Sequence, residues 1–381
     1  MTGSIHISAA VLTHPARRHI AERLRDEHPE LDPLVVVDPR PTGPRGAQRS
    51  ARLAWAAVPP HATHHLVVED DVVVSPEFTA ELYRVVAARP RDALSLFSEW
   101  GSRSTQAARI AALAGSPWVD VMADYVPTQA LVMPAEVARR FAAFLTATTD
   151  YEHTDAAVRR FLHAEGVEVV VSTVNLVDHL ELRSLLSGHD VWGPRPSGCY
   201  LPNPADRTDF ADWTGPVLRP RLVPYLPRAQ YLSRPLCLVK QRYDDDWRSL
   251  PATEYLATQG VPPHATMTDL LDALSAVPHG DALRGEIGYG MLHDLWQVVF
   301  VLGMAVAQIR PGIGEIQLKR AMSTSVARAL LGSIAGGALR DRVDAETLER
   351  LDPTFDTLVR RGVFAGAYHV TRQAATIGAA A

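Results

Sequence analysis

Short, mostly apolar runs separated by helical patterns mark the first half of the chain. Runs of this kind lie at residues 5–12, 34–38, 65–70, 93–97 and 167–171. Apolar residues along the whole length of a run are typical of strands that are covered on both faces. The intervening segments space their apolar residues as a helix does, as with Ile20 and Leu24. The alternation predicts an α/β fold with a mostly parallel sheet flanked by helices.

The pattern changes in the second half. Proline recurs every few residues from 194 to 235, which excludes long helices and predicts an extended connection. We therefore place an α/β domain at residues 1–193, the proline-rich connection at 194–235 and a mainly helical C-terminal domain at 236–381. Helical patterns in this last part lie at 268–277, 286–309, 321–338 and 344–362, the last with a predicted break at Pro353.

Three consecutive carboxylates, Glu69, Asp70 and Asp71, end the third apolar run, in THHLVVEDDV. Crowded carboxylates repel one another and are costly to bury, so such a strand end usually has a cation or hydroxyl groups to receive it. Mg²⁺ and Mn²⁺ prefer hard oxygen ligands of this kind. The outer Asp71 is the best placed to be a direct metal ligand, with Glu69 and Asp70 reaching hydroxyls or metal-bound water. The alternative is an acidic turn in water.

Other polar residues follow the first two predicted strands. Thr13 and His14 end the first strand, and Asp38 ends the second. In a parallel sheet ligands bind beyond the carboxyl ends of the strands, so these residues and the acidic triplet are predicted to share one rim. We assign Thr13, His14 and Asp38 to a nucleotide base and ribose, with Asp38 accepting from a base N–H.

Arginines cluster at the start of the second predicted helix. Arg45, Arg49 and Arg52 lie on or just before it. Guanidinium groups and a helix N-terminus both bind anionic oxygens, so these residues are candidates to hold a diphosphate. A solvated face of the helix is the alternative.

The amino-acid composition limits the classes of partner and the cellular location that we expect. With 38 basic and 43 acidic side chains the net charge is −5, so the protein as a whole has no positive electrostatic field that would attract nucleic acid. The two cysteines exclude a disulfide framework and fit a reducing cytoplasm. The N-terminus shows no secretory signal pattern, and polar residues such as His293 and Asp294 interrupt the longest apolar run. We expect a cytoplasmic protein in which that run is a buried helix and no segment spans a membrane.

Four motifs together carry a family resemblance over residues 5–200. They are VLTHP after the first strand, Asp38-Pro39 after the second, THHLVVEDDV and the distal VNLVDHLELRSLL. With these motifs the chain resembles bacterial glycosyltransferases of the GT-A superfamily, which are nucleotide-diphospho-sugar transferases. The resemblance implies a Rossmann-like sheet, a nucleotide-diphosphate sugar as donor, and Mn²⁺ or Mg²⁺. It does not reach the C-terminal domain.

The same resemblance assigns roles to individual residues. The triplet corresponds to the so-called DxD motif, of which Glu at the first position is a variation. The distal motif supplies His179, which completes the metal shell. The base of an inverting transfer lies at the start of the helix before the distal strand, which points to Asp155, with Glu152 in reserve. Capping of the helix by itself also explains an Asp at position 155.

These observations predict a metal-dependent, hexosyltransferase-like glycosyltransferase of bacterial glycan or natural-product biosynthesis. The acceptor is a hydroxyl of a small molecule, glycan or peptide. The alternatives are a sugar-phosphate nucleotidyltransferase and an inactive scaffold that assembles through its helices. The first alternative normally needs a Gly-rich basic loop after the first strand, and VLTHPARR has no glycine. A homodimer through the C-terminal helices fits any of these hypotheses.

Overall fold

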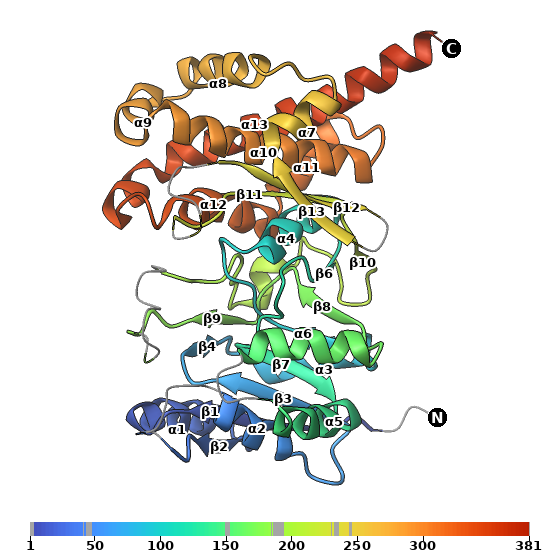
Figure 1. Ribbon diagram of the computed structural model, residues 1–381, viewed down its shortest axis with the longest axis vertical. Coiled ribbons are helices and arrows are strands. Elements are labelled where there is room, and N and C mark those ends of the chain that lie inside the picture. The colour runs from blue at the N-terminus through green and yellow to red at the C-terminus, as the bar shows by residue number, and fades with distance from the viewer. Residues whose placement is uncertain are drawn as a thin grey trace.

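The first half of the chain supplies seven strands of an eight-stranded sheet, and the proline-rich segment supplies the eighth. The computed structural model describes residues 4–40, 42, 48–148, 153–183, 185, 194–229, 231, 236–243 and 246–380. The sheet and its helices form one end of the molecule, and the helices of the second half form the other end (Figure 1). The chain is therefore an α/β protein with a mixed, mostly parallel sheet, followed by a helical C-terminal region.

The sheet has the strand order β10-β6-β8-β5-β7-β3-β1-β2. Its strands are β1 (Ile7–Thr13), β2 (Leu34–Val37), β3 (His64–Glu69), β5 (Ala93–Ser95), β6 (Trp118–Asp120), β7 (Ala130–Pro134), β8 (Val169–Ser172) and β10 (Val217–Leu218). β1 is parallel to both β2 and β3, and β5 is parallel to β8. β7 runs antiparallel between β3 and β5, and β6 runs antiparallel to β8. The ends of β1, β2 and β3 therefore meet at one rim, where the start of β7 also lies.

Helices cover both faces of the sheet because the strand side chains alternate. In β3, Leu66 and Val68 are buried in one apolar cluster and Val67 in another. The first cluster contains buried residues of α1 (Arg18–Glu27) and α3 (Phe78–Ala88). The second contains those of α2 (Gln48–Ala56), α4 (Arg103–Ala114), α5 (Ala135–Thr146) and α6 (Thr154–Ala164).

Two strands outside the large sheet form a small antiparallel pair. β4 (Val72–Val74) follows the acidic triplet, and β9 (Val177–His179) belongs to the distal motif. Their register places Val72 opposite His179 and Val74 opposite Val177. This pair connects two segments that lie far apart in the sequence.

The proline-rich segment joins the two parts of the molecule. It holds the short helix η3 (Pro204–Arg207) and β10, which extends the large sheet beside β6. It also holds β11 (Leu222–Tyr225), which pairs with β12 (Leu238–Tyr243), and β12 in turn pairs with β13 (Asp246–Pro251). The segment thus contributes a strand to each of the two sheets that it connects.

The C-terminal region is built around two packed helices. Its helices are α7 (Ala252–Thr258), α8 (Ala265–Ala276), α9 (Gly280–Ile287), α10 (Tyr289–Ile309), α11 (Glu315–Ser323), α12 (Ser325–Leu339) and α13 (Ala345–Ala380). α10 packs along α13 so closely that a methyl group at Gly366 would overlap the carbonyl oxygen of Phe300. The predicted break at Pro353 is wrong, because α13 runs through that residue without interruption.

Among the described residues, α10 is the one helix long and apolar enough to cross a membrane by composition. Within the protein, 78% of its most apolar window is buried. His293 bonds to Thr266 at 3.0 Å, and Asp294 accepts from the backbone N–H of Cys237 at 2.9 Å. α10 is therefore the core helix of this region in the structure.

The two parts share one apolar cluster and a buried ionic joint. Residues of α4 and α12, such as Ala107 and Leu330, belong to the same cluster. Glu99, which is buried, accepts from Arg228 of the proline-rich segment and pairs with Arg340 after α12. Trp100 packs its ring against Gly336 of α12. The contact between the two parts is thus both apolar and ionic.

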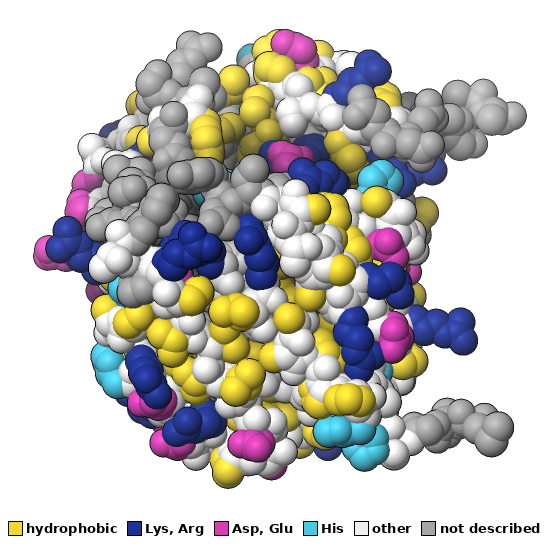
Figure 2. Space-filling model, turned by 60° about the horizontal axis from the view of Figure 1, so that its bottom comes forward, with side chains coloured by type: hydrophobic (Ala, Val, Ile, Leu, Met, Phe, Trp, Pro, Cys, Tyr) yellow, Lys and Arg dark blue, Asp and Glu magenta, His cyan; other side chains and the backbone are white. Residues whose placement is uncertain are grey.

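On the outside, acidic and basic side chains are interspersed with apolar ones on the face that Figure 2 presents. This mixed pattern agrees with the small net charge of −5.

Candidate active site

The acidic triplet lies at the rim where β1, β2 and β3 end. Glu69 is the last residue of β3, and its backbone N–H donates to the carbonyl of Gln129 at 3.0 Å. Thr128, just before β7, donates its hydroxyl to Oε1 of Glu69 at 2.7 Å. Thr13, at the end of β1, donates to Oδ2 of Asp70. The sheet therefore brings hydroxyl groups from both neighbouring strands to the carboxylates.

The β4–β9 pair brings His179 to the triplet. The backbone N–H of Leu180 donates to the carbonyl of Asp71 at 2.7 Å, which fixes the two segments next to the carboxylates. His179 is buried, and its Nε2 lies 3.6 Å from Oδ2 of Asp71. The predicted pair of metal ligands is therefore together in space, although 107 positions separate the two residues in the sequence.

Arg17 is a member of this group that the sequence analysis missed. Its Nη1 lies 3.1 Å from Oδ2 of Asp71 and 3.4 Å from Oδ1 of Asp70. Nη2 donates to the carbonyl of Arg183. The guanidinium group therefore neutralises part of the negative charge of the triplet.

Burial and repulsion set the protonation of the triplet. Burial of the carboxyl, followed by the charge of Asp71, raises the pKa of Glu69 to about 8, while the bond from Thr128 opposes the rise. Burial also raises the pKa of Asp70, against the effect of the Thr13 hydroxyl. For His179, burial lowers the pKa, and the nearby charge of Asp71 opposes this. The group thus carries less negative charge at neutral pH than three ordinary carboxylates.

Two polar atoms of the group are buried without a hydrogen-bond partner among the described residues. They are Oδ1 of Asp71 and Nδ1 of His179. A buried polar atom without a partner costs free energy unless something else binds it. A carboxylate oxygen and an imidazole nitrogen are both metal donors, so each of these two residues keeps one donor atom for a ligand.

The described residues alone do not complete a metal shell. No group of three or more His, Cys, Asp or Glu side chains among them has the geometry to hold an ion. Mg²⁺ is commonly held by one or two protein carboxylates together with water and substrate phosphates. A cation held by Asp71 and His179 would therefore need further ligands from water or from a bound molecule.

Asp155 lies in the first turn of α6, as the sequence predicts. Its Oδ1 accepts from the backbone N–H of Ala156 at 2.7 Å, and burial raises the pKa of its carboxyl. The charge of Asp155 contributes to the raised pKa values of both Glu69 and Tyr125, so the three groups interact electrostatically. The reserve candidate, Glu152, lies outside the described residues.

The residues assigned to the nucleotide have partners within the protein. Asp38 accepts from both Nε and Nη2 of Arg49, at 3.2 and 2.9 Å, in a buried ion pair. His14 uses Nδ1 to accept from the backbone N–H of Ala16, capping the helix η1 (Pro15–Arg17). Together with Thr13, which bonds to Asp70, all three residues thus have contacts within the protein. Their assignment to a nucleotide stays a prediction.

Arg52 and Arg45 are the other two arginines that the sequence assigns to the diphosphate. Arg52 donates from Nη2 to the carbonyl of Thr148 at 3.1 Å, on the side of α2 that faces the end of α5. Arg45 lies outside the described residues. The diphosphate role of these arginines stays a prediction, and Arg17 is the arginine that the structure places at the carboxylates.

Asp178, in the middle of β9, holds the backbone around His179 in place. Its Oδ1 accepts from the backbone N–H groups of His179 and Ser197, at 2.9 and 2.7 Å. Asp178 thus fixes the backbone on which His179 is mounted.

The missed residues differ in the signal that the sequence offers. Arg17 follows the first strand, so its place at the common rim was open to prediction. Thr128 precedes a strand, and it reaches Glu69 only because β7 runs antiparallel to β3. Strand direction is not encoded in a short apolar run, so no local pattern indicates Thr128.

Comparison of the chain with known protein families finds no matching family model, and comparison with curated proteins finds no match.

Proposed function

We propose that this protein is a metal-dependent glycosyltransferase that moves a sugar from a nucleotide-diphosphate donor to an acceptor hydroxyl. The observation that carries the proposal is the convergence of Asp71 and His179 at the end of β3, each with a buried polar atom left without a partner. The hydroxyl groups of Thr13 and Thr128 support the carboxylates beside them.

The chemistry of the donor explains the cation. Breaking the bond between sugar and diphosphate leaves negative charge on the departing phosphates, and bound Mn²⁺ or Mg²⁺ neutralises that charge. Asp71 and His179 would hold the ion, with phosphate oxygens as further ligands. Arg17 is the positive group already at this position, and in the proposal its guanidinium turns to the diphosphate when the donor binds.

The acceptor hydroxyl must lose a proton as it attacks the sugar. Burial raises the pKa of Asp155, which makes its carboxylate a stronger base than an exposed Asp. Asp155 therefore takes the proton, and Glu152 is the second candidate. Tyr125 interacts electrostatically with Asp155, and in the proposal its ring contacts the acceptor.

The test begins with binding. Isothermal titration calorimetry with Mn²⁺ and a panel of nucleotide sugars is expected to show a donor that binds only with the cation, followed by its slow hydrolysis. Asp71→Ala is expected to weaken Mn²⁺ binding by at least about tenfold, because a first-row cation loses a carboxylate ligand. Asp281→Asn, which removes an exposed carboxylate far along the chain, serves as the control. Unchanged binding in Asp71→Ala, with no donor bound by either protein, would refute the proposal.

A second variant separates ligation from charge. Arg17→Gln removes the cation-repelling guanidinium but leaves Asp71 and His179 in place. Binding of Mn²⁺ alone is therefore expected to strengthen, in the opposite direction to Asp71→Ala, while donor binding weakens. Loss of Mn²⁺ binding in Arg17→Gln would contradict a cation site formed by Asp71 and His179 beside this guanidinium.

The partners and location belong to the same proposal. The acceptor is a small molecule, glycan or peptide, the reaction takes place in the cytoplasm, and a homodimer forms through the C-terminal helices. Sedimentation velocity of the full-length chain measures the last of these directly.

A further inference from the structure

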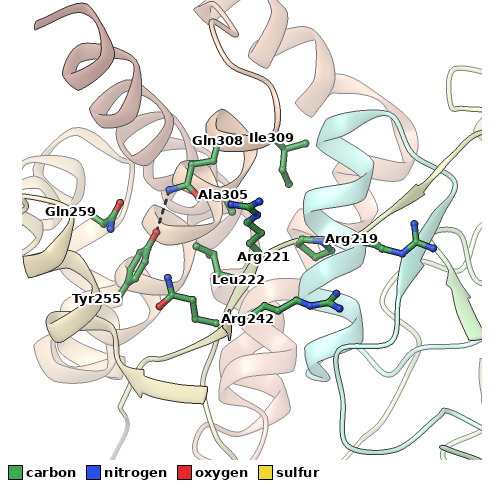
Figure 3. Close-up of a pocket in the computed structure, with 11 residues that line it drawn as sticks. Arg219, Arg221, Leu222, Arg242, Tyr255, Gln259, Ala305, Gln308 and Ile309 are labelled. Atoms are coloured by element: carbon green, nitrogen blue, oxygen red, sulfur yellow. Dashed lines mark hydrogen bonds between the residues drawn. The ribbon is translucent and has the colours of Figure 1, made fainter. Parts of the chain in front are cut away.

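A cavity of about 530 Å³ lies where the proline-rich segment meets the C-terminal helices. Arg219, Arg221 and Arg242 line it from the segment after β10 and from β12 (Figure 3). Tyr255 and Gln308, from α7 and α10, form the opposite wall and are joined by a hydrogen bond of 3.3 Å. The cavity is therefore built by four separate parts of the chain.

The charge of the lining has one sign. Three arginines and no acidic residue line the cavity. Arg219 pairs with Glu168 at the surface, and Arg242 lies 3.9 Å from Asp120, both carboxylates being outside the lining. Among the residues that the structure describes, Arg221 makes no ion pair. The guanidinium of Arg219 points away from Tyr255 and Gln308 (Figure 3). Arg221 and Arg242 remain, and each offers paired N–H donors to phosphate or carboxylate oxygens, which favours an oxyanion.

The remaining lining is apolar and uncharged. Pro220, Leu222, Ala305 and Ile309 supply an apolar surface. The volume lies within the range of 300 to 1,000 Å³ that is typical of small-molecule sites, and far above the volume of a single phosphate group. The space therefore suits an anionic group attached to a small organic body.

The cavity is separate from the acidic triplet. β10 is parallel to β6, which runs antiparallel to β8, and β8 is parallel to β5. Arg219 follows β10 and pairs with Glu168, which precedes β8, so the cavity lies at the opposite rim of the sheet from the carboxylates. A ligand bound there does not occupy the proposed donor site.

We infer that this cavity is a second binding site, for a small organic molecule that bears a phosphate or carboxylate group. Arg221 and Arg242 hold the oxyanion, and Leu222 and Ile309 contact the organic body. The inference is independent of the proposed transferase activity, because it uses none of the residues of the acidic triplet.

Phenyl phosphate, benzoate and inorganic phosphate are suitable probes for isothermal titration calorimetry at low ionic strength. Phenyl phosphate or benzoate is expected to bind saturably to the wild-type protein, and the tighter of the two identifies the preferred acid group. Arg221→Gln/Arg242→Gln is expected to weaken that binding by at least about tenfold, because two guanidinium donors are lost. Inorganic phosphate is expected to bind more weakly than phenyl phosphate, since it lacks the organic body.

Two controls locate the site. Arg320→Gln removes an exposed arginine of α11 outside the cavity and is expected to leave binding unchanged. Asp71→Ala is also expected to leave it unchanged, which separates this result from the test of the transferase. The inference is overturned if no probe binds saturably, if Arg320→Gln weakens binding as much as the double variant, or if inorganic phosphate binds as tightly as phenyl phosphate. Thermal melting of each variant confirms that it is folded.

Discussion

At the scale of single residues, burial decides which groups carry charge in this protein. The strand that presents the acidic triplet contains His65, which is fully buried. Its Nε2 lies 2.9 Å from the carbonyl of Ala54, and its Nδ1 lies 2.8 Å from the hydroxyl of Ser8. A neutral imidazole satisfies both contacts as one donor and one acceptor. Burial accordingly lowers the pKa of His65 to about 4.

This shift predicts a loss of stability in acid. Between pH 6.5 and about 4 the unfolded chain binds a proton at His65 that the folded protein does not bind. The free energy of unfolding therefore falls as the pH falls through this range, by up to about 3 kcal/mol. In His65→Gln the free energy of unfolding is expected to depend less on pH, because close to one fewer proton is taken up on unfolding. Urea unfolding at a series of pH values measures both slopes.

An exposed histidine provides the comparison for this experiment. His61 lies in water, and His61→Gln is expected to keep the wild-type slope. Equal slopes in wild type and His65→Gln would show that His65 does not resist protonation in the folded protein.

The candidate site shows what residue patterns can predict. The triplet after a buried strand predicts the rim, and the family resemblance points to His179 as the partner of Asp71. The partnership of Asp38 with Arg49 was not predicted, because both residue types also suit a ligand. Only the structure shows which partner a charged side chain has taken.

At the scale of elements, close backbone contact holds α10 against α13. Gly366→Ala is expected to destabilise the protein by about 1–3 kcal/mol, because the added methyl overlaps the carbonyl of Phe300 and forces the helices apart. Gly332→Ala, in α12, has no atom near the added methyl and is expected to be neutral or stabilising by about 0.5–1 kcal/mol. Thermal or urea unfolding of both variants makes the comparison, and equal effects of the two substitutions would contradict the contact at Phe300.

The five apolar runs of the first half correspond to β1, β2, β3, β5 and β8, because each of these strands is mostly apolar, whereas no run predicts β6. The direction of β7 is not predictable in this way, since a five-residue apolar strand has the same pattern in either direction. The break predicted at Pro353 is wrong for a related reason. Proline disfavours a helix interior locally, but buried neighbours such as Phe355 and Leu358 keep α13 continuous.

At the scale of the whole molecule, the two parts are expected to unfold together. A shared apolar cluster crosses between them, and Glu99 binds Arg228 and Arg340 at the joint. Glu99→Gln leaves two arginines without their carboxylate, one of them almost fully buried, and is expected to cost about 3 kcal/mol. Urea unfolding followed by tryptophan fluorescence and by circular dichroism is expected to give one coincident transition for the wild type.

An exposed ion pair supplies the control for the joint. Glu286 pairs with Arg350 at the surface, and Glu286→Gln is expected to leave the unfolding midpoint nearly unchanged. Two separate transitions in the wild type, or equal effects of the two variants, would argue against a joint that couples the parts.

The proline-rich segment explains why the domain division was hard to place from sequence. Its composition correctly excluded long helices, but it also supplies β10 to one sheet and β11 to the other. A short strand completed by distant partners leaves little trace in its own residues. Boundaries drawn from composition therefore mark a change of architecture within a shared core.

The β4–β9 pair has a consequence for how the protein is made. The triplet leaves the ribosome well before His179. The two come together only when β4 pairs with β9, which places Val72 opposite His179. Closing so long a loop is slow relative to local helix formation. A nascent chain therefore displays its three carboxylates without the imidazole, and Asp71 and His179 come together only after the β4–β9 pair has formed. Pulsed hydrogen exchange during refolding would then show protection at Leu180 appearing after protection in α1 and α3.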